Sequence, residues 1–329
     1  MSLRPVSAET PRRVAWSLEE LPPEPSAVTI GFFDGVHRGH QLLVDRASRH
    51  AASRSLRTVA ATFDRHPTQV TRPGSEPRLL MTLERRVRTL HEVGADLVLV
   101  IPFTVELSEL SPAGFVDEVL CDALNAHVVV VGENFRFGHL AVGDVGTLSS
   151  IGLDRGLEVD VVELLTLDGE ALSSTHIRRR LATGDVEWAA VALGRPHVID
   201  GVVVQCEGRG RSIGIPTANV SVSPHMQLPA NGVYAGHVEI APHYAGGARR
   251  VPAVTNVGVR PTFGGETFTV ETHLLDFESD LYGVRLGVEL AHRLREERRF
   301  ANPEGLVAQI RADIDEGREL LGLPRRPLP

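Results

Sequence analysis

The sequence has few cysteines and no long hydrophobic run. Cys121 and Cys206 are its only two cysteines and lie far apart without CxxC spacing, which excludes a disulfide framework and a cysteine-rich zinc site. Segment 1–25 is broken by prolines and charges and lacks the apolar stretch of a signal peptide. No later run approaches the roughly 18 apolar residues of a transmembrane helix. We therefore expect a soluble protein of the reducing cytoplasm with no membrane partner.

The chain also lacks an excess of positive charge. It has 34 Lys and Arg against 42 Asp and Glu, a formal net charge of -8 and an isoelectric point near 6.0. This balance argues against nucleic-acid binding, although a local basic patch can still hold phosphate groups. With 329 residues, 42% of them hydrophobic, the chain can form two cores, so two domains are expected. The oligomeric state is not indicated.

The hydrophobic pattern changes near residue 195. Before it, β-branched runs alternate with amphipathic stretches, which predicts an α/β domain with a doubly wound parallel sheet. After it, strands separated by Gly and Pro turns predict an antiparallel β-barrel or sandwich. We place the boundary so that the domains are 1–185 and 186–329. The predicted strands are 28–33, 58–63, 97–103, 127–132 and 157–164, followed by 198–204, 233–240, 251–257, 268–277 and 284–291.

Helices are predicted from His40 onward, over 84–93, over 112–124 and at the end of the chain. In the last helix, Asn302 is the expected N-cap and Pro303 the first helical residue. This helix is expected to plug or cover the barrel with one apolar face. That face consists of Leu306, Ile310, Ile314 and Leu321.

The segment 31–40, with the sequence GFFDGVHRGH, joins the first predicted strand to the first helix, where open parallel sheets bind ligands. Gly35 and Gly39 allow close backbone approach to phosphates, and a helix N-terminus offers N–H donors. His37 and His40 can both donate hydrogen bonds to one phosphate, as nucleotidyl transfer requires. Two surface histidines at a helix start would give the same short pattern.

This segment resembles the nucleotidyltransferase superfamily and, more narrowly, the bacterial bifunctional riboflavin kinase/FMN adenylyltransferase (FAD synthetase) family. Segments 62–67 (TFDRHP), 132–138 (GENFRFG) and 173–178 (SSTHIR) resemble further motifs of that family. The resemblance implies a nucleotidyltransferase domain in which His37 and His40 stabilise the transferring phosphate. It also implies nucleotide-binding roles for Gly31, Phe33, Gly39, Asn134, Ser174, Thr175 and Arg178. The physical properties of 173–178 agree, but an ordinary N-cap has the same pattern.

The second part of the chain contains a glycine-rich basic loop over 207–214. It lacks the Gly-Lys-Ser/Thr ending of a P-loop, yet its glycine N–H groups and its arginines can form an anion-binding nest. A flexible barrel loop remains the alternative. The ending 214–219 (GIPTAN) resembles the riboflavin kinase motif, which implies that Thr217 and Asn219 bind the Mg²⁺ of ATP. Their alternate spacing and oxygen donors suit Mg²⁺.

By the same resemblance, the nucleotide-binding residues of this loop are Gly210, Arg211, Gly214 and Pro216. Many relatives have Gly where this chain has Cys206. If that position requires positive φ, Cys206 strains the loop and weakens ATP binding.

Glu271 is presented by the predicted strand 268–277, on the same face as His273 and Leu275. The resemblance implies that Glu271 is the general base that takes a proton from the riboflavin 5′-hydroxyl. An exposed strand glutamate paired with Arg or Lys would look the same in sequence.

The sequence thus predicts an enzyme that makes FMN from riboflavin and ATP, and then FAD and pyrophosphate from FMN and ATP, with Mg²⁺ in both steps. One alternative is an adenylyltransferase acting on a different phosphate substrate, which leaves PTAN and Glu271 unexplained. Another is a flavin- and nucleotide-binding regulator that has lost kinase turnover, which only Cys206 favours.

Overall fold

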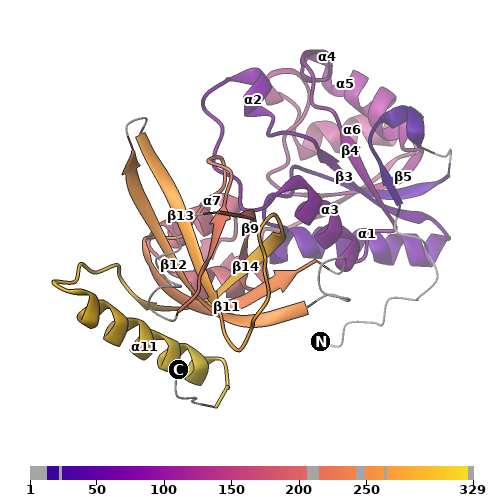
Figure 1. The fold of residues 1–329 in the computed structure, drawn as a ribbon. Helices are drawn as coiled ribbons and strands as arrows, with labels where there is room; N and C mark the ends of the chain where they lie inside the picture. The colour runs from indigo at the N-terminus through magenta and orange to yellow at the C-terminus, as the bar shows by residue number, and fades with distance from the viewer. Residues whose placement is uncertain (1–12, 22–23, 206–214, 242–248, 263–264, 325–329) are drawn as a thin grey trace. The chain divides into compact units, whose positions relative to one another are not determined.

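The chain forms two compact units (Figure 1). The computed structural model describes residues 13–21, 24–205, 215–241, 249–262 and 265–324. By its contacts, the first unit comprises Met1–Pro77 and Leu83–Ser173, and the second comprises Arg78–Thr82 and Ser174–Pro329. The chain therefore contributes a short early segment to the second unit. The domain boundary between 185 and 186 stays a prediction.

The first unit contains a six-stranded sheet in the order β1-β4-β3-β2-β5-β6, with parallel pairing at every contact between neighbours. After the edge strand β1, the chain enters near the middle with β2, adds β3 and β4 on the side of β1, and then adds β5 and β6 on the other side. This order confirms the doubly wound parallel sheet. The strands are β1 Arg13–Ala15, β2 Ser26–Ile30, β3 Arg57–Phe63, β4 Leu97–Ile101, β5 Ala126–Gly132 and β6 Glu158–Val162.

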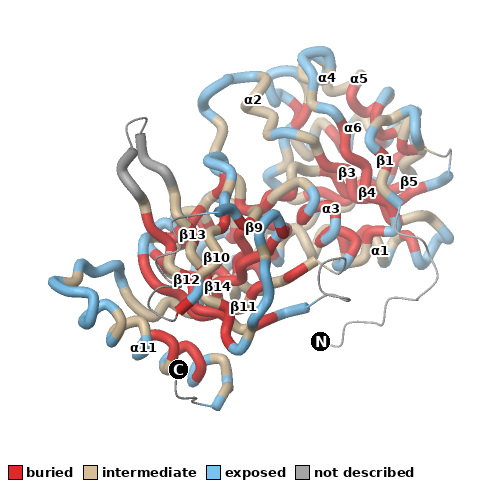
Figure 2. Tube along the Cα trace, viewed as in Figure 1, coloured by how far each residue is buried: buried red, intermediate tan, exposed pale blue. Residues whose placement is uncertain are grey.

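Helices bury both faces of this sheet, as the red strands in Figure 2 show. On one face, Ala47 and Ala51 of α1 pack against Ala27, Val128 and Val130. The opposite face packs against η2 and α6. The helices of the first unit are α1 Arg38–Arg54, α2 Thr68–Thr71, α3 Leu83–Glu92, α4 Val105–Glu109, α5 Pro112–Gly114, η2 Phe115–Ala123 and α6 Val145–Arg155, with short 3-10 turns η1 Leu18–Glu20 and η3 His139–Ala141.

The second unit contains a closed antiparallel barrel in the order β10-β13-β12-β11-β14-β9, which decides between the barrel and the sandwich. A buried hydrogen bond of 2.9 Å joins the hydroxyls of Thr255 and Thr272. The strands are β9 His197–Val204, β10 Ala218–Ser221, β11 Gly232–Ile240, β12 Arg249–Thr262, β13 Gly265–Leu274 and β14 Arg285–Arg295. The other elements are α7 Ser174–Ala182, α8 Val186–Leu193 and α11 Pro303–Leu320, and the first unit also has the small hairpin β7 Thr166–Leu167 and β8 Glu170–Ala171.

Helix α11 begins as predicted, because the Asn302 side chain accepts a hydrogen bond from the Gly305 N–H at 2.9 Å. It covers the outside of the barrel and does not plug it. Only its C-terminal half is buried (Figure 2), and Leu306 remains 37% exposed. Gly317 allows this contact, because a Cβ there would meet the Val254 side chain at 2.9 Å. Within the described residues, the helices are too short or too polar to cross a membrane.

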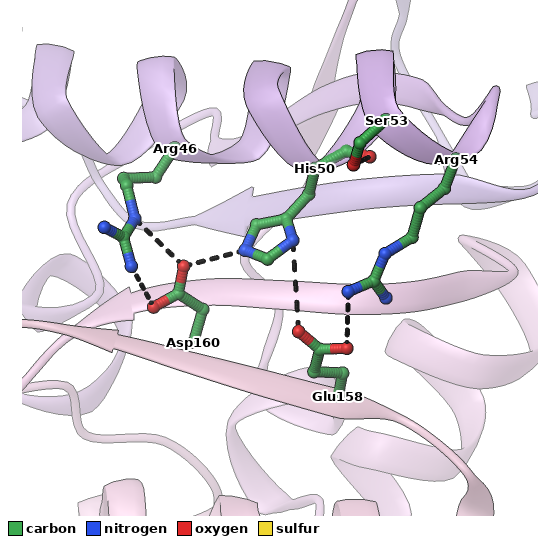
Figure 3. Close-up of polar contacts among 6 residues, drawn as sticks. All are labelled: Arg46, His50, Ser53, Arg54, Glu158 and Asp160. Carbon is green, nitrogen blue, oxygen red and sulfur yellow. Dashed lines mark hydrogen bonds and ion pairs between the residues drawn. The ribbon is translucent and has the colours of Figure 1, made fainter.

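An ion-pair network joins α1 to the edge strand β6 (Figure 3). Asp160 accepts hydrogen bonds from Arg46 at 3.0 and 2.9 Å, and the His50 ring lies 2.8 Å from the same carboxylate. Arg54 pairs with Glu158 at 2.7 Å. The network fixes the helix whose first turn carries the GFFDGVHRGH histidines.

The Asp160→Asn change should lower the free energy of unfolding of the first unit by about 1 kcal/mol at pH 7. The Arg46 hydrogen bonds, and more weakly His50, hold the pKa of Asp160 below its ordinary value in spite of burial. The carboxylate therefore contributes stability above its unfolded pKa of about 3.9 and loses it as pH falls through the lower folded pKa. Urea unfolding between pH 7 and pH 2.5 should show the two proteins converging below about pH 4.

Asp45→Asn is the matched control, since Asp45 and Arg49 form an exposed pair on the same helix. It should change stability by less than about 0.5 kcal/mol. A constant difference between Asp160→Asn and the wild type across the pH range would contradict the prediction.

Candidate active sites

In the first unit, the strand order brings two of the predicted motifs to one edge of the sheet. Strands β2 and β5 are neighbours at the point where the order reverses, and the loops that follow them leave from the carboxyl ends of both strands. Ligands bind at this point in open α/β sheets. The loop 31–37 carries the histidine motif, and Asn134 follows β5.

His37 and His40 lie together at the start of α1. Their rings stack with centroids 3.6 Å apart, and the His37 Nδ1 accepts a hydrogen bond from the His40 N–H at 3.4 Å. His37 is thus the N-cap of α1 as well as a candidate catalytic group. Because Nδ1 accepts, the neutral His37 ring carries its proton on Nε2, the form that can donate to an anion. A Cβ at Gly39 would meet the His37 ring at 3.1 Å, so glycine provides the space for this stacking.

The loop before His37 has an unusual backbone. Phe33, Gly35 and Val36 have φ values of 53°, 82° and 40°, and this is why β2 ends at Ile30 and does not reach the predicted residue 33. Phe33 is buried, and its ring would lie 3.2 Å from a Cβ at Gly31. The predicted residues Gly31 and Phe33 therefore shape this loop.

Arg86 of α3, to which the sequence analysis assigned no role, holds this loop. Its guanidinium is buried and donates to the Phe32 carbonyl at 2.6 Å and to the Phe63 carbonyl at 3.0 Å. It also stacks 4.2 Å from the centre of the Phe32 ring. Burial lowers the pKa of Arg86 to about 10, while Asp34 and Asp64 favour its charged form. It therefore stays charged at pH 7 and ties the ends of β2 and β3 together.

Asp64 follows β3 and Asn134 follows β5, the two strands that flank β2. Asp64 accepts hydrogen bonds from the Phe103 N–H at 2.8 Å and from Arg65, which makes it a turn element. Burial alone would raise the pKa of Asp64, but these bonds outweigh it and lower the pKa. Asn134 is exposed, and its side chain folds back over the end of the strand. Its side-chain oxygen lies so close to Gly132 that a Cβ there would meet it at 3.2 Å.

Ser174, Thr175 and Arg178 lie in the first turns of α7, within the second unit. The Arg178 Nε donates to the Arg78 carbonyl at 2.6 Å, in the early segment that belongs to the same unit. Their predicted role in binding ATP phosphates stays a prediction.

In the barrel, strand register places three polar residues in a row. Asn219 of β10 pairs with Glu271 of β13, and Glu271 pairs with Asn256 of β12. Directly paired residues project from the same face of a sheet with Cβ atoms roughly 5 Å apart. All three are half-buried. The predicted general base thus lies beside a predicted metal ligand, and Asn256, to which the sequence analysis assigned no role, joins them.

Thr217 precedes β10 and is half-buried. The adjacent Pro216 carbonyl lies 2.7 Å from the His273 Nδ1, and Ile215 is buried beneath α11 in a cluster with Val254 and Ile314. The predicted residues Gly210, Arg211 and Gly214, together with Cys206, lie outside the described residues. Among the described residues, no group of three or more His, Cys, Asp and Glu side chains is arranged to hold a metal ion.

Both halves of the chain match families of known proteins. Residues 20–176 match the family described as FAD synthetase, and residues 193–321 match the family described as riboflavin kinase. Bifunctional riboflavin kinase/FMN adenylyltransferases are 39% identical in Pseudomonas fluorescens (89% of this chain, 92% of the relative) and 36% identical in Escherichia coli K12 (94% and 97%). This chain belongs to the bifunctional riboflavin kinase/FMN adenylyltransferase family.

The Bacillus subtilis member of this family is 35% identical over 88% of this chain and 91% of its own length. A crystal structure described as a macrolide-efflux protein from Streptococcus pneumoniae shares the fold, with a TM-score of 0.82 and 29% identity over 93% of this chain and 98% of its own. The two family matches assign the parallel-sheet half to FAD synthesis and the barrel half to riboflavin phosphorylation. No relative named here supports the regulator alternative.

Two ion pairs, each with a buried partner on α11, hold this helix against the kinase barrel. Arg295, at the end of β14, binds Asp313 through two hydrogen bonds of 2.8 and 2.7 Å. Arg318 pairs with Asp276 at 2.9 Å. Asp313 and Arg318 are both nearly inaccessible, so these pairs replace hydration that the helix loses on docking.

Replacing Arg86 by Lys should selectively impair FAD synthesis. An ammonium can reach only one of the two carbonyls that the guanidinium spans, so the loop carrying His37 should loosen. FAD formation from FMN and ATP should slow roughly ten- to hundredfold. FMN formation from riboflavin, measured as FMN plus FAD, should stay within about twofold of the wild type.

The control is Arg88→Lys on the same helix, because Arg88 is half-exposed and pairs with Glu92 at 3.6 Å. It should leave both rates unchanged. Equal loss of both activities in Arg86→Lys would indicate general unfolding and contradict a local role.

Proposed function

We propose that the residues gathered at these two sites carry out the two steps of FAD synthesis, with riboflavin, FMN and ATP as substrates. The observation that supports the kinase assignment best is the row Asn219, Glu271 and Asn256 across three paired strands. The stacked pair His37 and His40 supports the adenylyltransferase assignment. We further propose that the enzyme acts in the cytoplasm, since both steps consume ATP.

In the kinase step, Glu271 accepts the proton of the riboflavin 5′-hydroxyl while that oxygen attacks the γ-phosphorus of ATP. The bond between the γ-phosphorus and the bridging oxygen breaks, and FMN and ADP form. A carboxylate held on a paired strand can orient the hydroxyl without moving itself. Phosphoryl transfer depends mainly on such positioning and on neutralising phosphate charge.

Mg²⁺ is proposed as the cofactor, and Thr217 and Asn219 would hold it. The donor set fits, because both side chains offer neutral oxygens, and Mg²⁺ bound to a nucleotide takes only one or two protein ligands. When bound, Mg²⁺ neutralises charge on the phosphates. Pro216 and the loop residues Gly210, Arg211 and Gly214 are proposed to contact the nucleotide.

In the adenylyltransferase step, a phosphate oxygen of FMN attacks the α-phosphorus of ATP, and pyrophosphate leaves as its bond to that phosphorus breaks. His37 and His40 donate hydrogen bonds to the phosphate oxygens, where negative charge develops. Support comes from the His37 tautomer, which directs its proton to Nε2. Gly31, Phe33, Gly39 and Asn134 are proposed to line the nucleotide pocket, with Ser174, Thr175 and Arg178 at the ATP phosphates.

Two single variants should separate the activities. Glu271→Gln keeps the shape of the side chain but removes the base, so FMN formation should fall by at least about 100-fold while FAD formation from FMN persists. His37→Ala should slow FAD formation by about 100-fold or more while FMN accumulates from riboflavin. Purified protein is incubated with ATP, Mg²⁺ and either flavin, and the flavins are separated by chromatography over time.

Each variant serves as the control for the other, because each should retain the activity of the other half. Loss of FAD synthesis in Glu271→Gln with kinase activity intact would contradict the assignment. Unchanged flavins with the wild-type protein in both reactions would instead favour a flavin-binding regulator.

A further inference from the structure

His273 makes a contact that the proposed chemistry does not yet use. It lies on β13 two residues after Glu271, on the same face of the strand. Its Nδ1 is 2.7 Å from the Pro216 carbonyl oxygen. Since a carbonyl only accepts hydrogen bonds, Nδ1 carries the proton and donates it.

The contact lies where backbone pairing ends. Strand β10 begins at Ala218, which pairs with Thr272, so residues before Ala218 are outside the ladder. Pro216 has no N–H and cannot donate a backbone hydrogen bond to β13. The His273 side chain therefore supplies a donor for the Pro216 carbonyl at a position outside the ladder.

Ile215, the residue before Pro216, holds the same segment through an apolar contact. Ile215 is 3% exposed and packs in the apolar cluster that includes Leu275 and Ile314 of α11. Ile215 fixes the segment against the helix, and the His273 bond fixes it against β13. Thr217 follows directly, between this bond and the start of β10.

The surroundings favour a neutral ring, whose single proton then lies on Nδ1. Burial lowers the pKa of His273, more than the Pro216 hydrogen bond and Asp276 raise it. The charge of Asp276 is itself balanced by Arg318 of α11, at 2.9 Å. At pH 7 the ring is thus a neutral donor to the carbonyl.

We propose that His273 is a positioning residue for the riboflavin kinase step, whose Nδ1–H fixes the Pro216 carbonyl and thereby sets Thr217 and Asn219 relative to Glu271. This inference rests on the roles proposed above for those three residues. In this role His273 itself touches neither the flavin nor the metal. Its removal should therefore weaken binding of Mg²⁺ and nucleotide while leaving Glu271 in place.

The test compares two amides at position 273. In His273→Asn, the amide nitrogen is as many bonds from the backbone as Nδ1 and can donate to the same carbonyl. In His273→Gln, the amide is one methylene further out and cannot donate from that position. The readouts are calorimetric affinity for ADP with Mg²⁺, and the Mg²⁺ concentration that gives half the maximal kinase rate.

His273→Gln should weaken both readouts about tenfold, the effect of one lost hydrogen bond, and His273→Asn should stay within about twofold of the wild type. FAD formation from FMN should be unchanged in both. His292→Gln, a half-exposed residue of β14, is the matched control and should match the wild type.

Wild-type behaviour of His273→Gln, or an equal loss in His273→Asn, would overturn the inference. Nitrogen-15 NMR of the wild-type ring tests it without a substitution, because a neutral ring protonated on Nε2 would also overturn it. Thr217→Val distinguishes failure of the proposed metal assignment from failure of the proposed role of His273. If Thr217→Val leaves Mg²⁺ dependence unchanged, the metal assignment itself fails; if it alone alters that dependence, only the role of His273 fails.

Discussion

Hydrogen bonding between neighbouring strands determines where the candidate residues of both halves lie. In the parallel sheet, pairing of β2 with β5 brings two loops to one edge, although His40 and Asn134 are 94 positions apart in the sequence. In the barrel, antiparallel register places Asn219 and Asn256 on either side of Glu271. In the parallel sheet the candidate residues come from loops, because the carboxyl ends of parallel strands lie at one edge. In the barrel they come from the strands themselves, because directly paired residues of an antiparallel ladder project from the same face.

Where these ladders stop, side chains donate hydrogen bonds to the backbone carbonyls. Arg86 donates to the Phe32 carbonyl beyond β2 and to the Phe63 carbonyl at the end of β3, and His273 donates to the Pro216 carbonyl before β10. A hydrogen bond of this kind contributes about 0.5–1.5 kcal/mol, so each donor stabilises the segment it holds. The segments concerned are those that carry His37 and Thr217. Residues that never meet a substrate can thereby set the geometry of those that do.

The sequence predicted the fold well where it had long apolar runs or clear helix-start residues. Apolar runs 97–101 and 128–131 became central strands, and Asn302 and Pro303 start α11 as expected. Helix α6 was missed because its Gly- and Ser-rich sequence has low helix propensity, and it depends on packing and on the Asp144 cap. Motifs identified candidate residues, but Arg86, Asn256 and His273 owe their places to packing and register, which leave no local pattern.

The backbone of 33–36 explains why the histidine motif needs its particular residues. Positive φ at Phe33 and Val36 is unfavourable by about 1–3 kcal/mol each, most of all for a β-branched residue. Both side chains are almost fully buried, which returns roughly 1.5–3 kcal/mol each. Burial therefore offsets the strain and holds the turn in one conformation. That turn places His37 as the cap of α1, so the apolar residues of the motif fix the direction in which its imidazoles face the sheet edge.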